Sequence, residues 1–154
     1  MAKKPTAADA QLILQLYDLR REAELRKARN WWVVTFWPRT ADEFIKVAAA
    51  LGTQENNWLR QAGGYWDLAA ALVLHGTIHA DLFLEGGSSG EMFFMYAKIQ
   101  PILTELREKM QSPGLFRNVE KVIMSSKAGR ERLKMVSARV ESRRKAMSET
   151  AKAN

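Results

Sequence analysis

The chain has 154 residues, of which 47% are hydrophobic and 27% are charged, and this composition is typical of one globular domain. It contains no cysteine, which excludes disulfides, thiolate metal sites and thiol catalysis and fits a reducing cytoplasm. The longest apolar run, residues 68–74, is far shorter than the roughly 20 residues of a membrane-spanning helix. We therefore expect a cytoplasmic protein without a transmembrane segment.

The net charge of +7 is unevenly distributed. Residues 1–30 hold 7 Lys and Arg against 4 Asp and Glu, and residues 31–125 hold 8 against 10. Residues 126–154 hold 9 against 3, which is a net charge of +6. A polyanionic partner would therefore meet the ends of the chain.

Apolar residues recur at helical spacing, and strand-like alternation is almost absent, so the chain is predicted to be all helical. The first helix should begin near Ala7 with Thr6 as its N-cap, and it can continue into the tryptophans. Pro38 restricts the residue before it, so this helix should end at Trp37 or just before.

The stretch "RNWWVVTFWPRT", residues 29–40, gathers four aromatic rings between basic residues. Exposed rings interleaved with cations are typical of a surface that stacks on nucleic-acid bases. The helical spacing of Val33, Phe36 and Trp37 instead favours packing in the core. A strand is the remaining alternative, but it would have no visible partner. We expect Phe36 and Trp37 to be mostly buried and Trp31 to be the most exposed ring.

Thr40 and Glu43 form a predicted capping box that opens a short second helix, which Gly52 ends. A third helix is predicted over residues 54–75. Because residues 68–74 are apolar all round, we expect this helix to be the buried centre of the fold.

Gly63 and Gly64 lie within that third helix, where each costs about 1 kcal/mol relative to alanine. A close helix contact or a kink would offset this cost. Arg60 and Asp67 lie near the apolar faces of the same helix. We expect any Arg–carboxylate pair there to fix packing register rather than to bind a ligand.

The segment "EGGSSGE", residues 85–91, is predicted to be a flexible loop, with Ser88 and Glu91 as a second capping box. Pro101 should kink the helix that follows, and a break near residues 125–126 should precede the last helix. The predicted fold is an irregular bundle of five or six helices around residues 54–75. One domain should cover residues 1–148, and residues 149–154 should be a frayed tail.

His75, His79 and Asp81 are the only weak candidates for a metal or catalytic site. Two histidines four residues apart can share a metal from a continuous helix, but Gly76 lies between them. A histidine in the last turn of a helix commonly bonds free carbonyl groups instead. No P-loop, dinucleotide fingerprint or nucleophile motif is present, and we expect no cofactor.

The last helix combines a narrow apolar seam with many cations. The seam predicts packing on a partner helix, in the same chain or in a second copy. The self-association candidates are Leu133, Val136, Val140 and Met147. The polyanion-binding candidates are Lys127, Arg130, Arg132, Lys134, Arg139, Arg143, Arg144 and Lys145.

The stretches "YDLRREAELRKARNW", "NNWLRQAGGYWDLAAALV" and "GTIHADLF" resemble a family of small helical bacterial proteins of unknown function, over about residues 12–101. The resemblance implies an all-helical fold in a bacterial protein, but no activity or site. Members often carry an N-terminal membrane span, and this sequence shows none.

These observations lead us to expect a non-enzymatic interaction or regulatory module that binds a protein partner or self-associates through its terminal helices. The first alternative is a binder of nucleic acid or an anionic membrane surface that uses the basic last helix. The second alternative is an enzyme or metal protein that uses the two histidines and Asp81.

Overall fold

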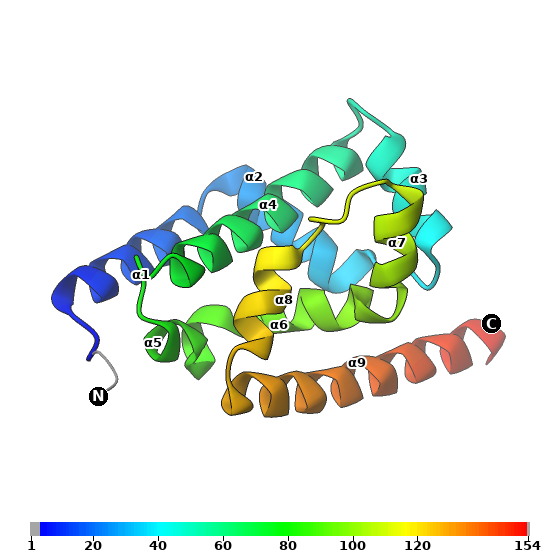
Figure 1. The fold of residues 1–154 in the computed structure, drawn as a ribbon. Helices are drawn as coiled ribbons and strands as arrows, with labels where there is room; N and C mark the ends of the chain where they lie inside the picture. Colours follow the sequence, from blue (N-terminus) through cyan, green and yellow to red (C-terminus); the bar gives the residue numbers. More distant parts are fainter. Residues whose placement is uncertain (1–3, 154) are drawn as a thin grey trace.

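Figure 1 shows the computed structural model, which describes residues 4–153. No strand occurs among these residues, so the predicted all-α class is confirmed. The chain is divided into more helices than the five or six expected. In chain order the elements are α1 (Ala7–Leu19), α2 (Ala23–Asn30), the π-helix η1 (Trp31–Thr35), α3 (Ala41–Ala49), α4 (Gln54–Leu74), α5 (Ala80–Leu84), α6 (Gly86–Ile99), the 3-10 helix η2 (Gln100–Ile102), α7 (Leu103–Lys109), α8 (Arg117–Met124) and α9 (Lys127–Ala153).

Side-chain caps fix several helix starts where the sequence predicts them. Thr6 and Asp9 form a reciprocal capping box at the start of α1. The Thr40 hydroxyl accepts a hydrogen bond from the Glu43 N–H at 3.2 Å and starts α3. The Glu43 carboxylate accepts from the N–H of Arg39 instead of Thr40, so only half of the predicted box forms.

The first helix is not continuous, and this part of the prediction is wrong. α1 ends before a turn at residues 20–22, where the Glu22 carboxylate accepts from the N–H groups of Glu24 and Leu25. These bonds satisfy free donors at the start of α2. From there the helical path continues through η1 to Thr35, close to the predicted end.

α4 packs against α2, α3, α5 and α8, which confirms its central place. It remains unbroken through its two glycines. A Cβ atom on Gly63 would lie 3.3 Å from Cζ of Phe116, so this glycine permits a close approach. α4 is not buried on all sides, however, because Leu68 is 60% exposed and Leu74 is 39% exposed.

The segment 85–91 is helical rather than a loop, because α6 already begins at Gly86. Ser88 lies inside the helix, and its hydroxyl donates to the carbonyl oxygen of Phe83, so it does not cap with Glu91. Gly90 instead permits close packing of α6 against α9. A Cβ atom on Gly90 would lie 3.2 Å from a guanidinium nitrogen of Arg132 in α9.

Among the described helices α6, rather than the expected α4, has the largest share of buried residues. Its chain then breaks at Pro101, where η2 separates α6 from α7 as predicted. The buried side chains of α6 are Ser89, Met92, Phe93, Met95, Tyr96, Ala97, Lys98 and Ile99.

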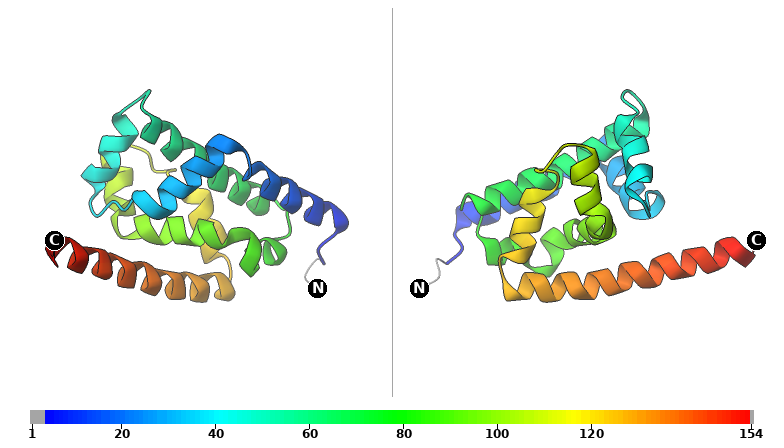
Figure 2. Two further views of the ribbon diagram at one scale, coloured as in Figure 1. Left: turned by 180° about the vertical axis from the view of Figure 1, so that it is seen from behind. Right: turned by 45° about the vertical axis from the view of Figure 1, so that its right-hand side comes forward.

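α9 lies along α6 on one side of the bundle, and its C-terminal end projects past the other helices (Figures 1 and 2). The predicted break near residues 125–126 separates it from α8. The expected frayed segment 149–154 is helical as far as Ala153. None of the helices formed by residues 4–153 is long and apolar enough to cross a bilayer.

Candidate functional site

The rings of residues 29–40 form part of the core. Trp32 is fully buried, and Trp31 and Phe36 are 7% and 8% exposed. The predictions of core packing and of a buried Phe36 are confirmed. The prediction that Trp31 is the most exposed ring is wrong. The π-helical turn brings residues five apart together, so the rings of Trp31 and Phe36 stack at 4.4 Å. Trp37 is half-buried, and these rings form no exposed stacking platform.

Lys98 is fully buried beneath this aromatic group. Its Nζ donates to the carbonyl oxygen of Trp32 and lies 4.0 Å from the ring centroid of Trp37. Among the described residues no carboxylate oxygen lies within 4.0 Å of it. Burial, with a smaller contribution from the positive charge of Arg144, lowers the pKa of Lys98 to about 7.

The apolar seam of α9 packs on its own chain. Leu133 is 6% exposed and Val140 is fully buried, both within the main core. Val136 is half-buried, and Met147 lies nearer the projecting end with 36% of its surface exposed. The seam is therefore occupied by α6, as in the same-chain version of the prediction.

Two of the eight candidate cations of α9 are turned inward. Arg132 donates to the carbonyl oxygen of Leu84 at 2.5 Å and to the Ser89 hydroxyl at 3.2 Å. Its guanidinium also lies 4.4 Å from the centroid of the Phe93 ring. Arg144 donates to the carbonyl oxygen of Lys98 at 2.6 Å. These two arginines hold α9 on α5 and α6.

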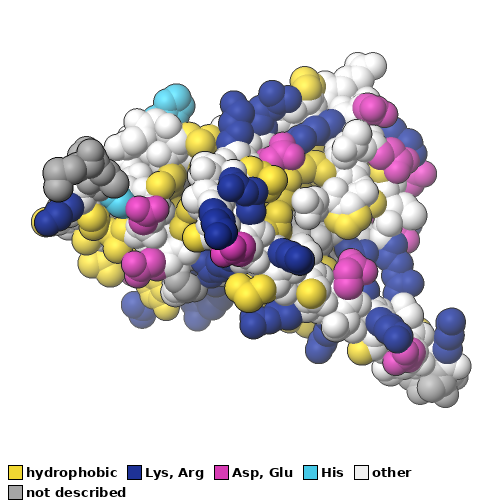
Figure 3. Space-filling model, turned by 60° about the horizontal axis from the view of Figure 1, so that its bottom comes forward, with side chains coloured by type: hydrophobic (Ala, Val, Ile, Leu, Met, Phe, Trp, Pro, Cys, Tyr) yellow, Lys and Arg dark blue, Asp and Glu magenta, His cyan; other side chains and the backbone are white. Residues whose placement is uncertain are grey.

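The other six candidate cations are exposed along the outward side of α9, and Figure 3 shows the face to which they belong. Among residues 4–153, the only carboxylate within 4.0 Å of any of the six is Glu131, at 3.8 Å from Lys127. Lys152 is exposed on the same helix. It was not among the predicted candidates because it lies in the segment expected to be frayed. The six are Lys127, Arg130, Lys134, Arg139, Arg143 and Lys145.

The six cations flank an outward ridge of mostly small or acidic residues. At about 100° per residue, one flank of the ridge carries Lys127, Arg130, Lys134 and Lys145. Arg139 and Arg143 fall on the other flank. The ridge between them carries Glu131, Met135, Ala138, Ser142, Ala146 and Glu149.

The histidines have separate structural positions. His75 is the exposed C-cap residue of α4, and its N–H donates to the carbonyl oxygen of Ala71. His79 is the N-cap of α5, and its N–H donates to an Asp9 carboxylate oxygen at 2.8 Å. Asp81 is exposed in α5. Across residues 4–153 no group of three or more His, Cys, Asp or Glu side chains is placed to hold a metal ion.

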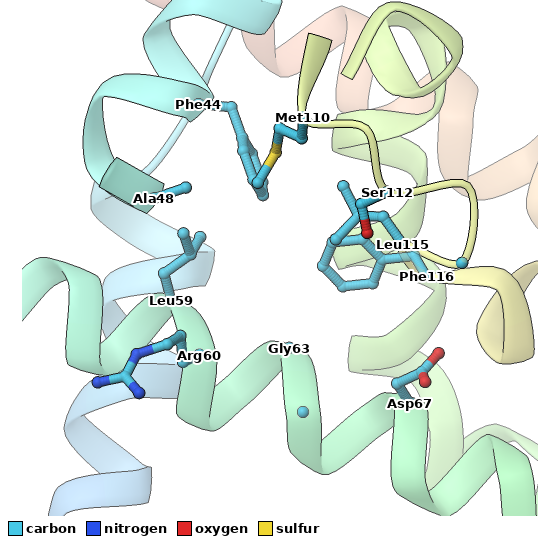
Figure 4. A pocket seen from close by; sticks show the side chains of 12 residues that line it. Phe44, Ala48, Leu59, Arg60, Gly63, Asp67, Met110, Ser112, Leu115 and Phe116 are labelled. Carbon is cyan, nitrogen blue, oxygen red and sulfur yellow. The ribbon is translucent and has the colours of Figure 1, made fainter. Parts of the chain in front are cut away.

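A separate cavity of about 390 Å³ opens between α3, α4 and residues 110–116 (Figure 4). Its α4 side is formed partly by Gly63 and Gly64. Its polar lining side chains are Arg60, Asp67 and Ser112. Its apolar lining side chains are Phe44, Ala48, Leu59, Met110, Leu115 and Phe116.

Arg60 and Asp67 do not pair with each other. Arg60 donates to the side-chain oxygens of Asn56 and Asn57, and Figure 4 shows its guanidinium turned away from the cavity. Asp67 accepts a 2.8 Å hydrogen bond from Asn118 on one carboxylate oxygen. The other oxygen is buried and has no hydrogen-bond partner among the described residues.

A partly buried ion pair joins Arg29 to Glu91, which the sequence predicts only as a capping residue. Arg29 donates to both carboxylate oxygens of Glu91, at 2.9 and 2.7 Å. The Trp66 indole N–H donates to the same carboxylate. Glu91 raises the pKa of Arg29 through this hydrogen bonding. The two residues are 62 positions apart, so no local spacing could have revealed the pair.

Comparison with known proteins gives a family but no activity. Residues 5–126 match the family described as Domain of unknown function (DUF4760). No curated protein and no solved structure matches the chain. The match covers α1 to α8 and ends where α9 begins, so α9 lies outside the matched region. The chain therefore belongs to this family of proteins of unknown function.

Proposed function

We propose that this chain is a non-enzymatic interaction module that binds a polyanionic partner along the outward side of α9. The observation that carries the proposal is that the cations of this helix point in two directions. Arg132 and Arg144 are hydrogen-bonded to α6, whereas six further cations face outward, and among the described carboxylates only Glu131 lies within 4.0 Å of any of them. Exposed cations on a rigidly docked helix suit repeated contacts with phosphates.

The occupied seam favours nucleic acid over a membrane as the partner. A helix that lies on lipid inserts its apolar face between the headgroups. In α9 that face, with Leu133 and Val140, is buried on α6. The outward ridge offers Met135 but no aromatic ring. Self-association through the same seam would require α9 to leave α6, so we do not favour it.

The ridge also suits a duplex. α9 has 27 residues, and at about 1.5 Å per residue it spans roughly 40 Å, a little more than one turn of DNA. The ridge carries Glu131 and Glu149 near its two ends, and the small residues between them, such as Ala138 and Ser142, allow a close approach to a groove at the middle of the helix. The cations on both flanks would then meet the phosphates of the two strands.

The test compares two variants of the full chain that lose the same charge. The first replaces Lys134, Arg139, Arg143 and Lys145 with glutamine. The matched control replaces four exposed cations on other helices: Arg21, Arg26, Lys46 and Lys121. Point variants are preferable to deletion of α9, because deletion would uncover the apolar surface of α6.

Binding to a labelled 20-base-pair duplex is measured by fluorescence anisotropy, alongside sedimentation with anionic phospholipid vesicles. We expect the α9 variant to bind the duplex at least about 100-fold more weakly than the control variant, because each lost phosphate contact removes counterion release. Equal weakening in both variants would refute a dedicated α9 surface. Binding to vesicles but not to duplex would refute the choice of nucleic acid.

A further inference from the structure

The cavity beside α4 is independent of α9 and has the character of a ligand site. Its volume of about 390 Å³ lies in the range of small-molecule pockets, roughly 300–1,000 Å³. Most of its lining is apolar, and Asp67 and Ser112 lie toward one side (Figure 4). An apolar molecule with one polar group would match this distribution.

The two glycines of α4 indicate that the space is built into the chain. Glycine destabilises the interior of a helix relative to alanine. The ring of Phe116 accounts for Gly63, since a Cβ atom there would lie 3.3 Å from it. No such contact accounts for Gly64, because a Cβ atom there would meet nothing within 4 Å. The absent side chain of Gly64 leaves the α4 side of the cavity open.

Opposite α4, the loop that lines the cavity begins and ends at residues with an uncommon backbone conformation. Gln111 and Phe116, which bracket the loop, have φ angles of +50° and +52°. Residues other than glycine rarely adopt this left-handed conformation, and such residues cluster where a chain is shaped for a ligand. The loop that they bracket contributes Ser112 and Leu115 to the cavity.

Asp67 determines the charge that the cavity would accept. One of its carboxylate oxygens has no hydrogen-bond partner among the described residues, and no cation in that part of the chain lies within 4.0 Å of the carboxylate. Arg60, the one basic residue of the lining, is bonded to Asn56 and Asn57. The free oxygen of Asp67 can accept a hydrogen bond from an N–H or O–H donor, and a positively charged donor would form the stronger, charge-assisted bond.

We propose that this cavity binds a small organic ammonium ion whose aromatic or alkyl body lies against the apolar lining. The ammonium group donates to the free oxygen of Asp67, and the Ser112 hydroxyl lies on the same side of the cavity (Figure 4). The apolar body rests over Gly64 and against Leu59 and Leu115.

The test uses three probes of similar size: phenethylammonium, 2-phenylethanol and 3-phenylpropanoate. Each is titrated into the ¹⁵N-labelled full chain, and amide shifts are followed by NMR. We expect phenethylammonium to shift the amides of Gly64, Ser112 and Gly114 in a saturable manner. It should bind at least about tenfold more tightly than the alcohol or the carboxylate, as expected of a charge-assisted hydrogen bond.

Three variants separate the site from general effects. Gly64→Leu fills the open side of the cavity and removes a helix-weakening glycine, so it should remain folded and bind at least about tenfold more weakly. Gln61→Leu places the same side chain at an exposed position outside the cavity and should bind normally. Asp67→Asn should abolish the preference for the cation over the alcohol.

Three results would overturn the proposal. One is the absence of any saturable shift with phenethylammonium. Another is equal binding of the three probes to the wild type, which would indicate a merely apolar cavity suited to a partner's side chain. The third is unchanged binding in Gly64→Leu, which would place the probe elsewhere.

Discussion

Replacement of Lys98 by methionine should change how the stability of the protein depends on pH. Lys98 is fully buried, and its Nζ lies against Trp37 and the carbonyl oxygen of Trp32, with no carboxylate oxygen of residues 4–153 within 4.0 Å. In the folded protein its pKa is lowered to about 7, whereas the ordinary value is 10.5. Between these two pH values the unfolded chain binds more protons than the folded one, so stability rises with pH.

The size of the effect follows from the two pKa values. One pKa unit corresponds to about 1.4 kcal/mol. At pH 7 the ammonium of Lys98 is about half deprotonated in the folded state and fully protonated in the unfolded state. At pH 9 it is neutral in the folded state. The free energy of unfolding should therefore rise by roughly 2 kcal/mol from pH 7 to pH 9 through this group alone. Below about pH 6 the group should contribute no further pH dependence, because Lys98 is then protonated in both states.

The assay is urea denaturation of the wild type and Lys98→Met at pH 7, 8 and 9. The stability difference between the two proteins should change by roughly 2 kcal/mol over this range, with the variant favoured most at low pH. Lys134→Met, which alters an exposed lysine of α9, is the matched control and should leave the pH dependence unchanged. If the free energy of unfolding changes with pH in the same way for the wild type and Lys98→Met, burial of this lysine does not destabilise its charged form, and the argument is refuted.

Three further substitutions test the packing. In Gly129→Ala the new Cβ would meet the carbonyl oxygen of Ile123. We therefore expect faster tryptic cleavage within α9 and a lower melting temperature. Unchanged digestion would contradict this close contact between the end of α8 and the start of α9. Gly63→Ala should destabilise the protein because of the ring packed on it, whereas Gly64→Ala should stabilise it by about 0.5–1 kcal/mol, and paired urea melts would expose any reversal of this order. Trp32→Ala should cost about 3–5 kcal/mol in chemical denaturation, and a loss below about 1 kcal/mol would be inconsistent with its full burial.

Most helix boundaries were predictable because the signals are local. The hydroxyls of Thr6 and Thr40 cap their helices as expected, and Gly52 and Gly76 adopt the positive φ angles of helix ends. The start of α6 was not predictable from such signals. Its Gly- and Ser-rich first turns are typical of a loop, and the close contact with Arg132 explains one of these residues, Gly90.

The candidate sites depend more strongly on tertiary structure. The cations of α9 could be identified from the sequence, but not the inward orientation of Arg132 and Arg144, since both bind groups on α6. The π-helical turn reversed the expected exposure of Trp31. The cavity combines α4 with a loop about 50 residues later in the chain, so its lining could not be read from spacing.

The most direct test of the central proposal is the salt dependence of duplex binding by the full-length wild type. If about six cations of α9 contact phosphates, a plot of log K against log salt concentration should have a slope near −5. The slope should become less steep by about one for each of Lys134, Arg139, Arg143 and Lys145 that is replaced with glutamine. A slope near zero, or one that the four replacements leave unchanged, would contradict the assignment of α9 as a polyanion-binding surface.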